Sequence, residues 1–126
     1  MIQPIDVPAL PPNNPTYSQA VRLGEAIYVS GQLGVHPATR ELVPGGIRAQ
    51  TRQALENIAV VLTAAGSRSS LIAKVNIFIT DFSLLPAMNE VYAAMLPHKP
   101  AKTTVEISRL DKGALIEIEV VAGVAA

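Results

Sequence analysis

The segments Pro100-Ala101-Lys102-Thr103-Thr104-Val105-Glu106-Ile107 and Ala114-Leu115-Ile116-Glu117-Ile118-Glu119-Val120-Val121 decide the fold of this chain. Polar and apolar residues alternate along both, which is the period-two pattern of β-strands. In the first segment Lys102 and Thr104 share one face, and the face with Val105 is expected to pack on the core. In the second, Glu117 lies opposite a face of isoleucine and valine. Solvent-exposed strands show the same alternation, so the rest of the chain must decide whether Lys102 and Glu117 belong to a site.

The composition favours an apolar, oligomeric, cytoplasmic protein. The chain has 126 residues, of which 49% are hydrophobic, enough to bury a core in one domain. Ten basic residues balance ten acidic ones, and no basic run indicates binding to nucleic acid. There is no cysteine, and His36 and His98 are isolated, so we expect no metal site. We also expect no membrane partner, because no segment has the pattern of a targeting signal or the roughly 20 apolar residues that span a bilayer.

The first structural unit is predicted to be a β-hairpin. Residues 17–22 and 26–31 have strand character and flank a turn at Leu23-Gly24-Glu25. Ser30-Gly31-Gln32 ends the hairpin at a point where backbone can approach a ligand or another chain, although a Gly31 that only permits a β-bulge is an equally good interpretation. The proline-rich residues 1–15 are expected to form an extended, irregular lead-in over the surface.

Two amphipathic helices are predicted, with a strand at 74–80 between them. Over 47–65 apolar residues recur at three- and four-residue spacing, and Gly66 supplies the C-terminal stop. Polar residues off this stripe, Asn57 among them, are interpreted as a solvated face. The second helix is predicted to begin with Ser83 as its cap and to bury Met88 and Tyr92.

The expected order of elements is therefore ββαβαββ in a single domain over 1–126. This order predicts the α+β class, with one mixed sheet and both helices packed on one of its faces. The other face would then be left for neighbouring subunits to cover, and such interfaces commonly hold ligand pockets.

The chain resembles the RidA/YjgF family of reactive intermediate deaminases, also described as L-PSP endoribonuclease-like, over residues 17–122. The motifs that carry the resemblance, in chain order, are Tyr17-Ser18-Gln19-Ala20, Tyr28-Val29-Ser30-Gly31-Gln32, Gln50-Thr51-Arg52-Gln53-Ala54-Leu55-Glu56-Asn57, Asn89-Glu90-Val91-Tyr92, Pro100-Ala101-Lys102-Thr103 and Ile116-Glu117-Ile118-Glu119. The resemblance implies a chorismate-mutase-like fold that closes into a trimeric barrel, with a pocket at each subunit interface of the homotrimer. It also implies hydrolysis of enamines and imines such as 2-aminoacrylate and 2-iminopropionate to a 2-keto acid and ammonia, without a cofactor.

The same resemblance assigns site residues. It implies catalytic roles for Glu117 and Tyr17. It also implies a group of residues that contact the substrate, a small carboxylate-bearing imine or keto acid. These substrate-binding residues are Lys102, Ser30, Gly31, Asn89 and Thr104. The alternative for Glu117 is a strand carboxylate that pairs structurally with Lys102 or Arg109.

Lys102 stands where the family has an arginine. An arginine holds a carboxylate with two parallel hydrogen bonds, whereas a lysine offers a single point charge. The loss of one charged hydrogen bond, about 1.5–3 kcal/mol, predicts about tenfold to a hundredfold weaker binding. The alternative function is therefore a homologue without standard deaminase activity: either an enzyme of a specialised pathway, which could use Lys102 as a base or Schiff-base amine, or a regulatory trimer that binds a small carboxylate.

Overall fold

The computed structural model describes residues 1–11 and 14–126. The strands are β1 (Gln3–Pro4), β2 (Ala20–Leu23), β3 (Ala26–Leu33), β4 (Ile72–Ile79), β5 (Ala101–Glu106) and β6 (Ile116–Gly123), and the α-helices are α1 (Gly46–Ala64) and α2 (Leu85–Met95). Short 3₁₀ helices at Ser69–Leu71, Phe82–Leu84 and Asp111–Gly113 precede β4, α2 and β6. The predicted order ββαβαββ is confirmed, with β1 added in front of it.

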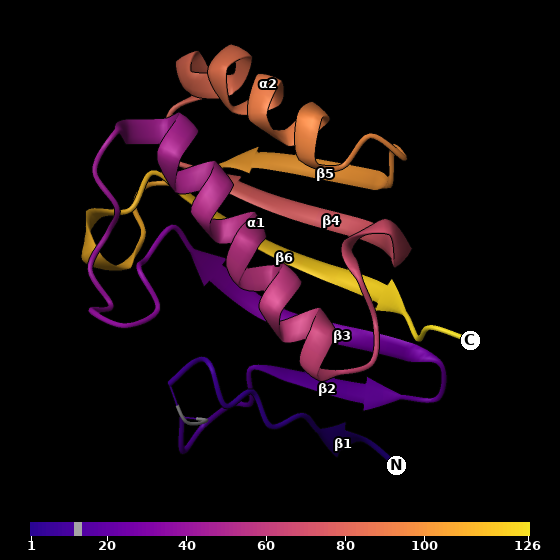
Figure 1. Ribbon diagram of the computed structural model, residues 1–126. Coiled ribbons are helices and arrows are strands. Elements are labelled where there is room, and N and C mark those ends of the chain that lie inside the picture. Colours follow the sequence, from indigo (N-terminus) through magenta and orange to yellow (C-terminus); the bar gives the residue numbers. More distant parts are fainter. Residues whose placement is uncertain (12–13) are drawn as a thin grey trace.

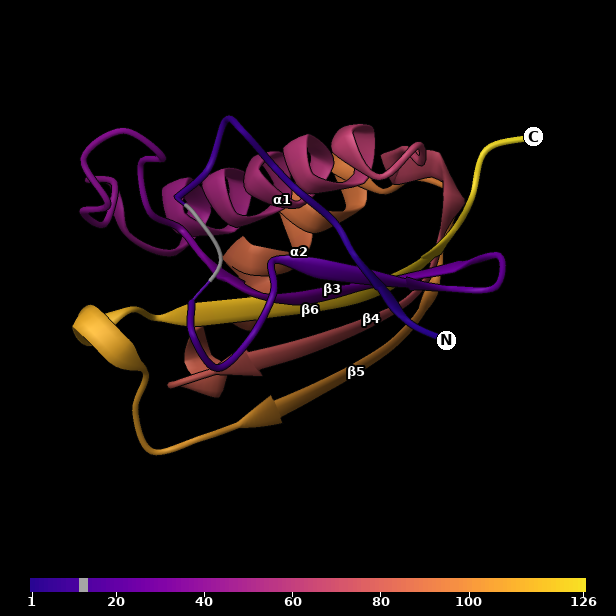
Figure 2. The ribbon, with the colours of Figure 1, turned by 90° about the horizontal axis from the view of Figure 1, so that it is seen from below.

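The strands form one six-stranded sheet in the order β1-β2-β3-β6-β4-β5 (Figure 1). Strands β4 and β5 run parallel, and every other neighbouring pair is antiparallel. Both helices lie on the same side of the sheet, and no helix of the described residues covers the opposite side (Figure 2). The predicted α+β class, with a mixed sheet and helices on one face, is therefore confirmed. We call the uncovered side the open face.

The core fills the space between the helices and the sheet. Ile58 and Leu62 of α1 and Met88 of α2 are completely buried there, together with Ile77 of β4 and Ile118 of β6. Each such side chain contributes about 1.5–3 kcal/mol through burial. The apolar stripes of the two helices thus pack against the apolar face of the sheet, as predicted.

The prediction for the faces of β5 was wrong. In the parallel register Val75, Ile77 and Ile79 of β4 lie beside Lys102, Thr104 and Glu106 of β5. The same β4 residues are buried under the helices, so Lys102 and Thr104 point to the helix side. Val105 points to the open face instead and is 40% exposed. The reason is that β5 is an edge strand, whose facing follows its register with β4 rather than its own alternation.

The N-terminal region also departs from the prediction. Strand β2 begins at Ala20 rather than at Tyr17. The Asn14 side chain accepts a hydrogen bond from the Thr16 amide at 2.9 Å, which holds residues 14–17 in a turn. The lead-in is not wholly irregular, because β1 pairs with β2 and the Ile5 amide donates to the carbonyl of Ala20 at 2.9 Å.

The residue at the start of the second helix that accepts the capping hydrogen bond differs from the prediction. Ser83 does not cap α2. Instead Asp81 accepts a hydrogen bond from the Ser83 amide at 2.8 Å, at the 3₁₀ turn that leads into α2. Pro86 lies in the first turn of α2. Among the residues that the structure describes, no helix is long and apolar enough to cross a membrane.

Candidate functional site

The centre of the candidate site is the contact between Glu117 and Gly31. Glu117 lies on the open face of β6, where β6 pairs with β3. The register of that pair shifts between Val29 and Gln32, so Gly31 lies in a β-bulge. A Cβ atom at residue 31 would lie 2.5 Å from Oε1 of Glu117 and 2.7 Å from its Cδ. Gly31 therefore does more than permit the bulge, because only glycine leaves room for this carboxylate.

Hydrogen bonds from Ser30 and Gln32 hold the bulge in place. The Ser30 hydroxyl donates to the carbonyl of Ser18 at 2.6 Å, and the Ser30 amide donates to the carbonyl of Gln19 at 2.9 Å. Gln32 is 8% exposed, and its amide nitrogen donates to Gln19 Oε1 at 3.0 Å. Ser30 thus ties the bulge to the segment that precedes β2.

The surroundings of Glu117 favour its protonated form. Burial raises the pKa of Glu117 above its ordinary value, and the negative charges of Glu119 and Asp111 raise this pKa further. A carboxyl group of this kind can give and take a proton closer to neutral pH than an exposed glutamate can.

Glu117 lines a pocket of about 480 Å³. Tyr17, Gly31 and Glu117 line it together, with Leu10 of the lead-in and Arg40 of the loop after β3. Its remaining wall includes the 3₁₀ helix Asp111–Gly113. The Tyr17 side chain is 55% exposed. The structure thus brings three of the predicted site residues into one pocket.

Three other predicted residues, Lys102, Asn89 and Thr104, form a second cluster on the helix side of the sheet, while Ser30 lies at the bulge of β3. The Lys102 ammonium donates a hydrogen bond to Asn89 Oδ1 at 3.2 Å and lies 4.7 Å from the centre of the Tyr92 ring. Thr104, two residues further along β5, has a buried hydroxyl that makes no hydrogen bond with the described residues. Buried polar groups usually have a partner, so this hydroxyl is an exception among the described residues.

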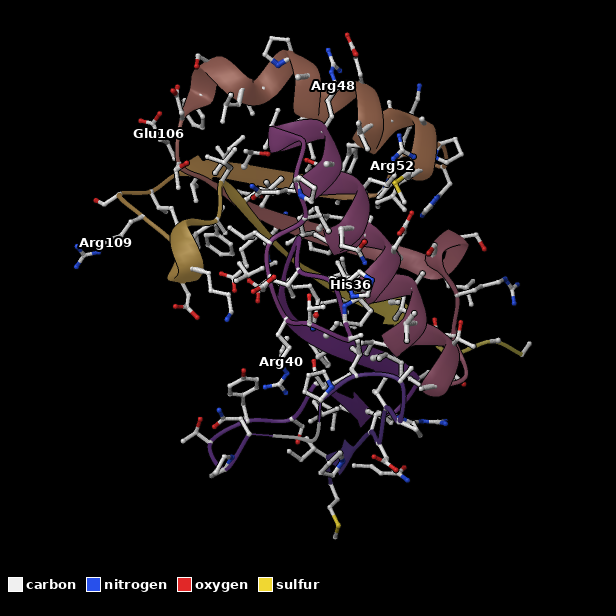
Figure 3. The ribbon with its side chains drawn as sticks, turned by 60° about the vertical axis from the view of Figure 1, so that its left-hand side comes forward. His36, Arg40, Arg48, Arg52, Glu106 and Arg109 are labelled. Carbon is white, nitrogen blue, oxygen red and sulfur yellow. The ribbon has the colours of Figure 1, made fainter. Side chains whose placement is uncertain are left out.

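The two clusters lie on opposite faces of one sheet, so Glu117 and Lys102 cannot touch the same small molecule within one copy of the chain. Glu117 makes no ion pair with Lys102 or Arg109 within residues 1–11 and 14–126, and Arg109 projects away from the sheet (Figure 3). Within one copy of the chain, Glu117 is therefore not a structural partner of either residue.

Sequence reasoning missed Asn57 as a residue of the pocket. The helical pattern puts Asn57 on a solvated face, but it is 2% exposed and lines the pocket. Its amide nitrogen donates to the carbonyls of Leu33 and Val35, at 3.3 and 2.9 Å. The sequence feature that could have indicated burial of Asn57 is its seven-residue spacing from Gln50, which puts both residues on the same side of α1. Gln50 is also buried, and its side chain accepts a hydrogen bond from the Leu115 amide at 2.9 Å.

The structure offers no cluster of metal ligands. Within residues 1–11 and 14–126, no group of at least three His, Asp or Glu side chains could hold an ion. The His98 ring contacts the carbonyl of Ile72 at 2.9 Å, and the His36 ring accepts a hydrogen bond from the Ala38 amide at 3.1 Å. Both histidines thus have local structural contacts.

Comparison with known proteins places these features in a family. The family model described as endoribonuclease L-PSP matches residues 9–124. A RutC family protein of Sulfurisphaera tokodaii is 47% identical over 106 residues, covering 83% of this chain and 85% of the relative. A 2-iminobutanoate/2-iminopropanoate deaminase of Dermatophagoides farinae is 41% identical over 116 residues, covering 91% of each chain. The crystal structure of E. coli TdcF with bound serine superimposes with a TM-score of 0.89 at 33% identity, covering 98% of this chain and 99% of TdcF.

Proposed function

Because the chain belongs to the endoribonuclease L-PSP family, the RidA/YjgF family that its motifs resemble, we propose that it is a deaminase of small 2-imino acids. Its substrates would be enamines and imines such as 2-aminoacrylate and 2-iminopropanoate, and its products a 2-oxo acid and ammonia. Two relatives support this choice: one is named for this activity, and TdcF binds serine, a small molecule with a carboxylate.

The observation that carries the proposal is the division of the site between two faces. Glu117, Gly31 and Tyr17 share the pocket, while Lys102 and Asn89 lie on the far side of the sheet. In a closed ring of three copies, each pocket would receive Lys102 from the neighbouring copy. The homotrimer would also bury apolar side chains of the open face, such as Tyr28, which is 44% exposed.

In the proposed complex Lys102 of the neighbouring copy binds the substrate carboxylate. Asn89 accepts a hydrogen bond from the same ammonium group and so fixes its position. The free hydroxyl of Thr104 adds a donor beside it. The backbone of the bulge at Ser30 and Gly31 positions the substrate nitrogen, and Tyr17 closes the pocket mouth.

Glu117 supplies the proton transfers. Its protonated carboxyl gives a proton to the terminal carbon of the enamine, which becomes an iminium ion. Water then attacks the C=N carbon while the Glu117 carboxylate takes one proton from it, which gives a carbinolamine. Glu117 next protonates the amino nitrogen, the C–N bond breaks, and the hydroxyl proton returns to Glu117 as the ketone forms. One water is consumed and one ammonia released, so the residue ends as it began.

Lys102 favours a second candidate function. A lysine gives the carboxylate one charged contact in place of the two that an arginine gives. A trimer that binds small carboxylates without turnover, or an enzyme of a specialised pathway, would keep the same pocket with this weaker anchor. RNA has less support as a substrate, because the net charge is zero and the chain has only five aromatic residues, three tyrosines and two phenylalanines.

A coupled assay tests the proposal. A pyridoxal-phosphate lyase generates 2-aminoacrylate continuously, and pyruvate formation is followed with and without the protein. We expect pyruvate to appear faster with the protein at micromolar concentration than by spontaneous hydrolysis. An unchanged rate with the folded oligomer would favour the carboxylate-binding candidate, which ligand-induced stabilisation with pyruvate would then support.

A further inference from the structure

Two cations that the proposed hydrolysis does not use line the same pocket as Glu117. Arg40 lies in the loop after β3, and Lys112 lies in the 3₁₀ helix that leads toward β6. They come from parts of the chain that are far apart in sequence, on either side of both α-helices. Figure 3 shows Arg40 between its own loop and the N-terminal lead-in.

Both residues have a backbone conformation that residues other than glycine usually avoid. Arg40 has φ 63° and Lys112 has φ 60°, in the left-handed region that favours glycine. Among the described residues only one other non-glycine residue, Lys99, has a positive φ, and it does not line the pocket. Left-handed residues other than glycine tend to occur where a ligand or a function requires them.

The Arg40 loop is held firmly by its backbone. The Arg40 amide donates to the carbonyl of His36 at 2.7 Å, and the His36 amide donates to the carbonyl of Glu41 at 2.8 Å. The Val43 amide donates to the carbonyl of Gly34 at 3.0 Å, which joins the loop to the end of β3. The guanidinium group is therefore carried to the pocket by an ordered turn.

Neither cation is neutralised by the protein. Within residues 1–11 and 14–126, the Arg40 guanidinium and the Lys112 ammonium make no hydrogen bond or ion pair. Asp111 and Glu117 also line the pocket, but neither makes an ion pair with Arg40 or Lys112 among the described residues. Both cations thus remain free to bind an anion from solution.

The pocket of one copy, about 480 Å³, extends from Glu117 to the wall that carries Arg40 and Lys112. A longer substrate could have its imino group beside Glu117 and still reach the wall that carries Arg40.

We propose that Arg40 and Lys112 bind a second carboxylate, so that the pocket prefers 2-imino dicarboxylates, such as 2-iminoglutarate, over imines with apolar side chains. This inference rests on the proposed function for the reacting end of the substrate. Arg40 matches a carboxylate with two parallel hydrogen bonds, and Lys112 adds a point charge. Lys102 of the neighbouring copy would then bind the carboxylate next to the imine.

Binding of the corresponding 2-oxo acids tests the proposal separately from turnover. Isothermal titration calorimetry with 2-oxoglutarate and with 2-oxobutanoate compares the intact protein with Arg40→Gly and Lys112→Asn. Glycine and asparagine suit the left-handed backbone, so both variants should fold. Lys99→Asn removes a left-handed cation outside the pocket and is the matched control.

We expect 2-oxoglutarate to bind about tenfold more tightly than 2-oxobutanoate, since one charged contact is worth at least that factor. Arg40→Gly and Lys112→Asn should each lose most of this preference without weakening 2-oxobutanoate, and Lys99→Asn should keep it. The proposal is overturned if 2-oxoglutarate shows no preference or no binding, or if Arg40→Gly weakens both acids equally. A dicarboxylate preference without turnover of any imine would contradict the deaminase function alone.

Discussion

Lys102 and Glu117 lie on opposite faces of one β-sheet, Lys102 on the helix side and Glu117 on the open face. Lys102 lies beside Val75 on β4, whereas Glu117 pairs with Phe78, which points the other way. Because the sheet separates them, a site that uses both residues has to take them from different copies of the chain.

Gly31→Ala should displace the Glu117 carboxylate. The new methyl would lie 2.5 Å from Glu117 Oε1, and the carboxylate, at the end of a flexible side chain, would rotate away from it. We expect little change in melting temperature and loss of most deaminase activity. Gly123→Ala, on β6, is the control because no atom lies within 4 Å of the position that its new methyl would take; it should retain both. Full activity in Gly31→Ala would mean that the carboxylate position is unimportant.

Glu117→Gln should lower the rate about 10²- to 10⁴-fold, because it removes the group that transfers protons. The oligomer should remain folded, since the two side chains have nearly the same shape. The rate is measured with 2-aminoacrylate generated by a lyase. A rate equal to that of the intact protein would exclude Glu117 as the acid and base.

The stability of the intact protein and that of Glu117→Gln should depend differently on pH. The raised pKa of Glu117 means that the folded state holds more protons than the unfolded state above the ordinary value of 4.5. The intact protein should therefore lose stability relative to Glu117→Gln as the pH rises from 4.5 through the raised pKa, and the difference in stability should become independent of pH below 4.5. Urea unfolding at a series of pH values measures this. A relative gain in stability over that window would show that the folded-state pKa is lowered instead.

Lys102→Arg should raise kcat/KM for 2-aminoacrylate about tenfold to a hundredfold, because it restores the second hydrogen bond to the carboxylate. Lys74→Arg is the matched control on the neighbouring strand, where the lysine donates to Thr103 Oγ1 at 2.7 Å. This control should leave the rate unchanged. If Lys102→Arg has no effect either, the pocket serves other chemistry.

Thr104→Val should separate stability from function. The buried hydroxyl of Thr104 has no partner among the described residues, so its removal should stabilise the protein by about 1–3 kcal/mol, the cost of an unsatisfied buried group. If the hydroxyl binds substrate, the KM should rise at the same time. Urea unfolding and steady-state kinetics measure the two effects. A stabilised variant with unchanged KM would remove Thr104 from the site.

Local sequence patterns predicted the elements and the layers well. The apolar stripe of α1 and the alternation of β6 both point to the side where Ile58, Leu62 and Ile118 are buried. The family motifs led to Glu117, Gly31 and Tyr17, which the structure gathers around one pocket. These features depend on spacing along the chain, which a sequence displays directly.

Features set by neighbours were predicted poorly. The facing of β5 depends on its register with β4, and Thr104 and Val105 differ too little in polarity to reveal it. Tyr17 has the pattern of a strand residue, but the Asn14 side chain forms a turn before it. Asn57 has the spacing of a solvated residue, yet its amide satisfies two carbonyls under the loop after β3. In each case a contact with a distant or side-chain partner outweighed the local pattern.

Complementation between two defective variants tests the shared site most directly. Lys102→Ala and Glu117→Ala should each be inactive alone. When they are unfolded, mixed in equal amounts and refolded together, random assembly into closed trimers leaves about a quarter of the pockets with both residues intact. The predicted result is about a quarter of the activity of the intact protein, with each variant refolded alone as the control. Activity no higher than in these controls, in mixed trimers shown to have formed, would contradict a site that is built from two copies.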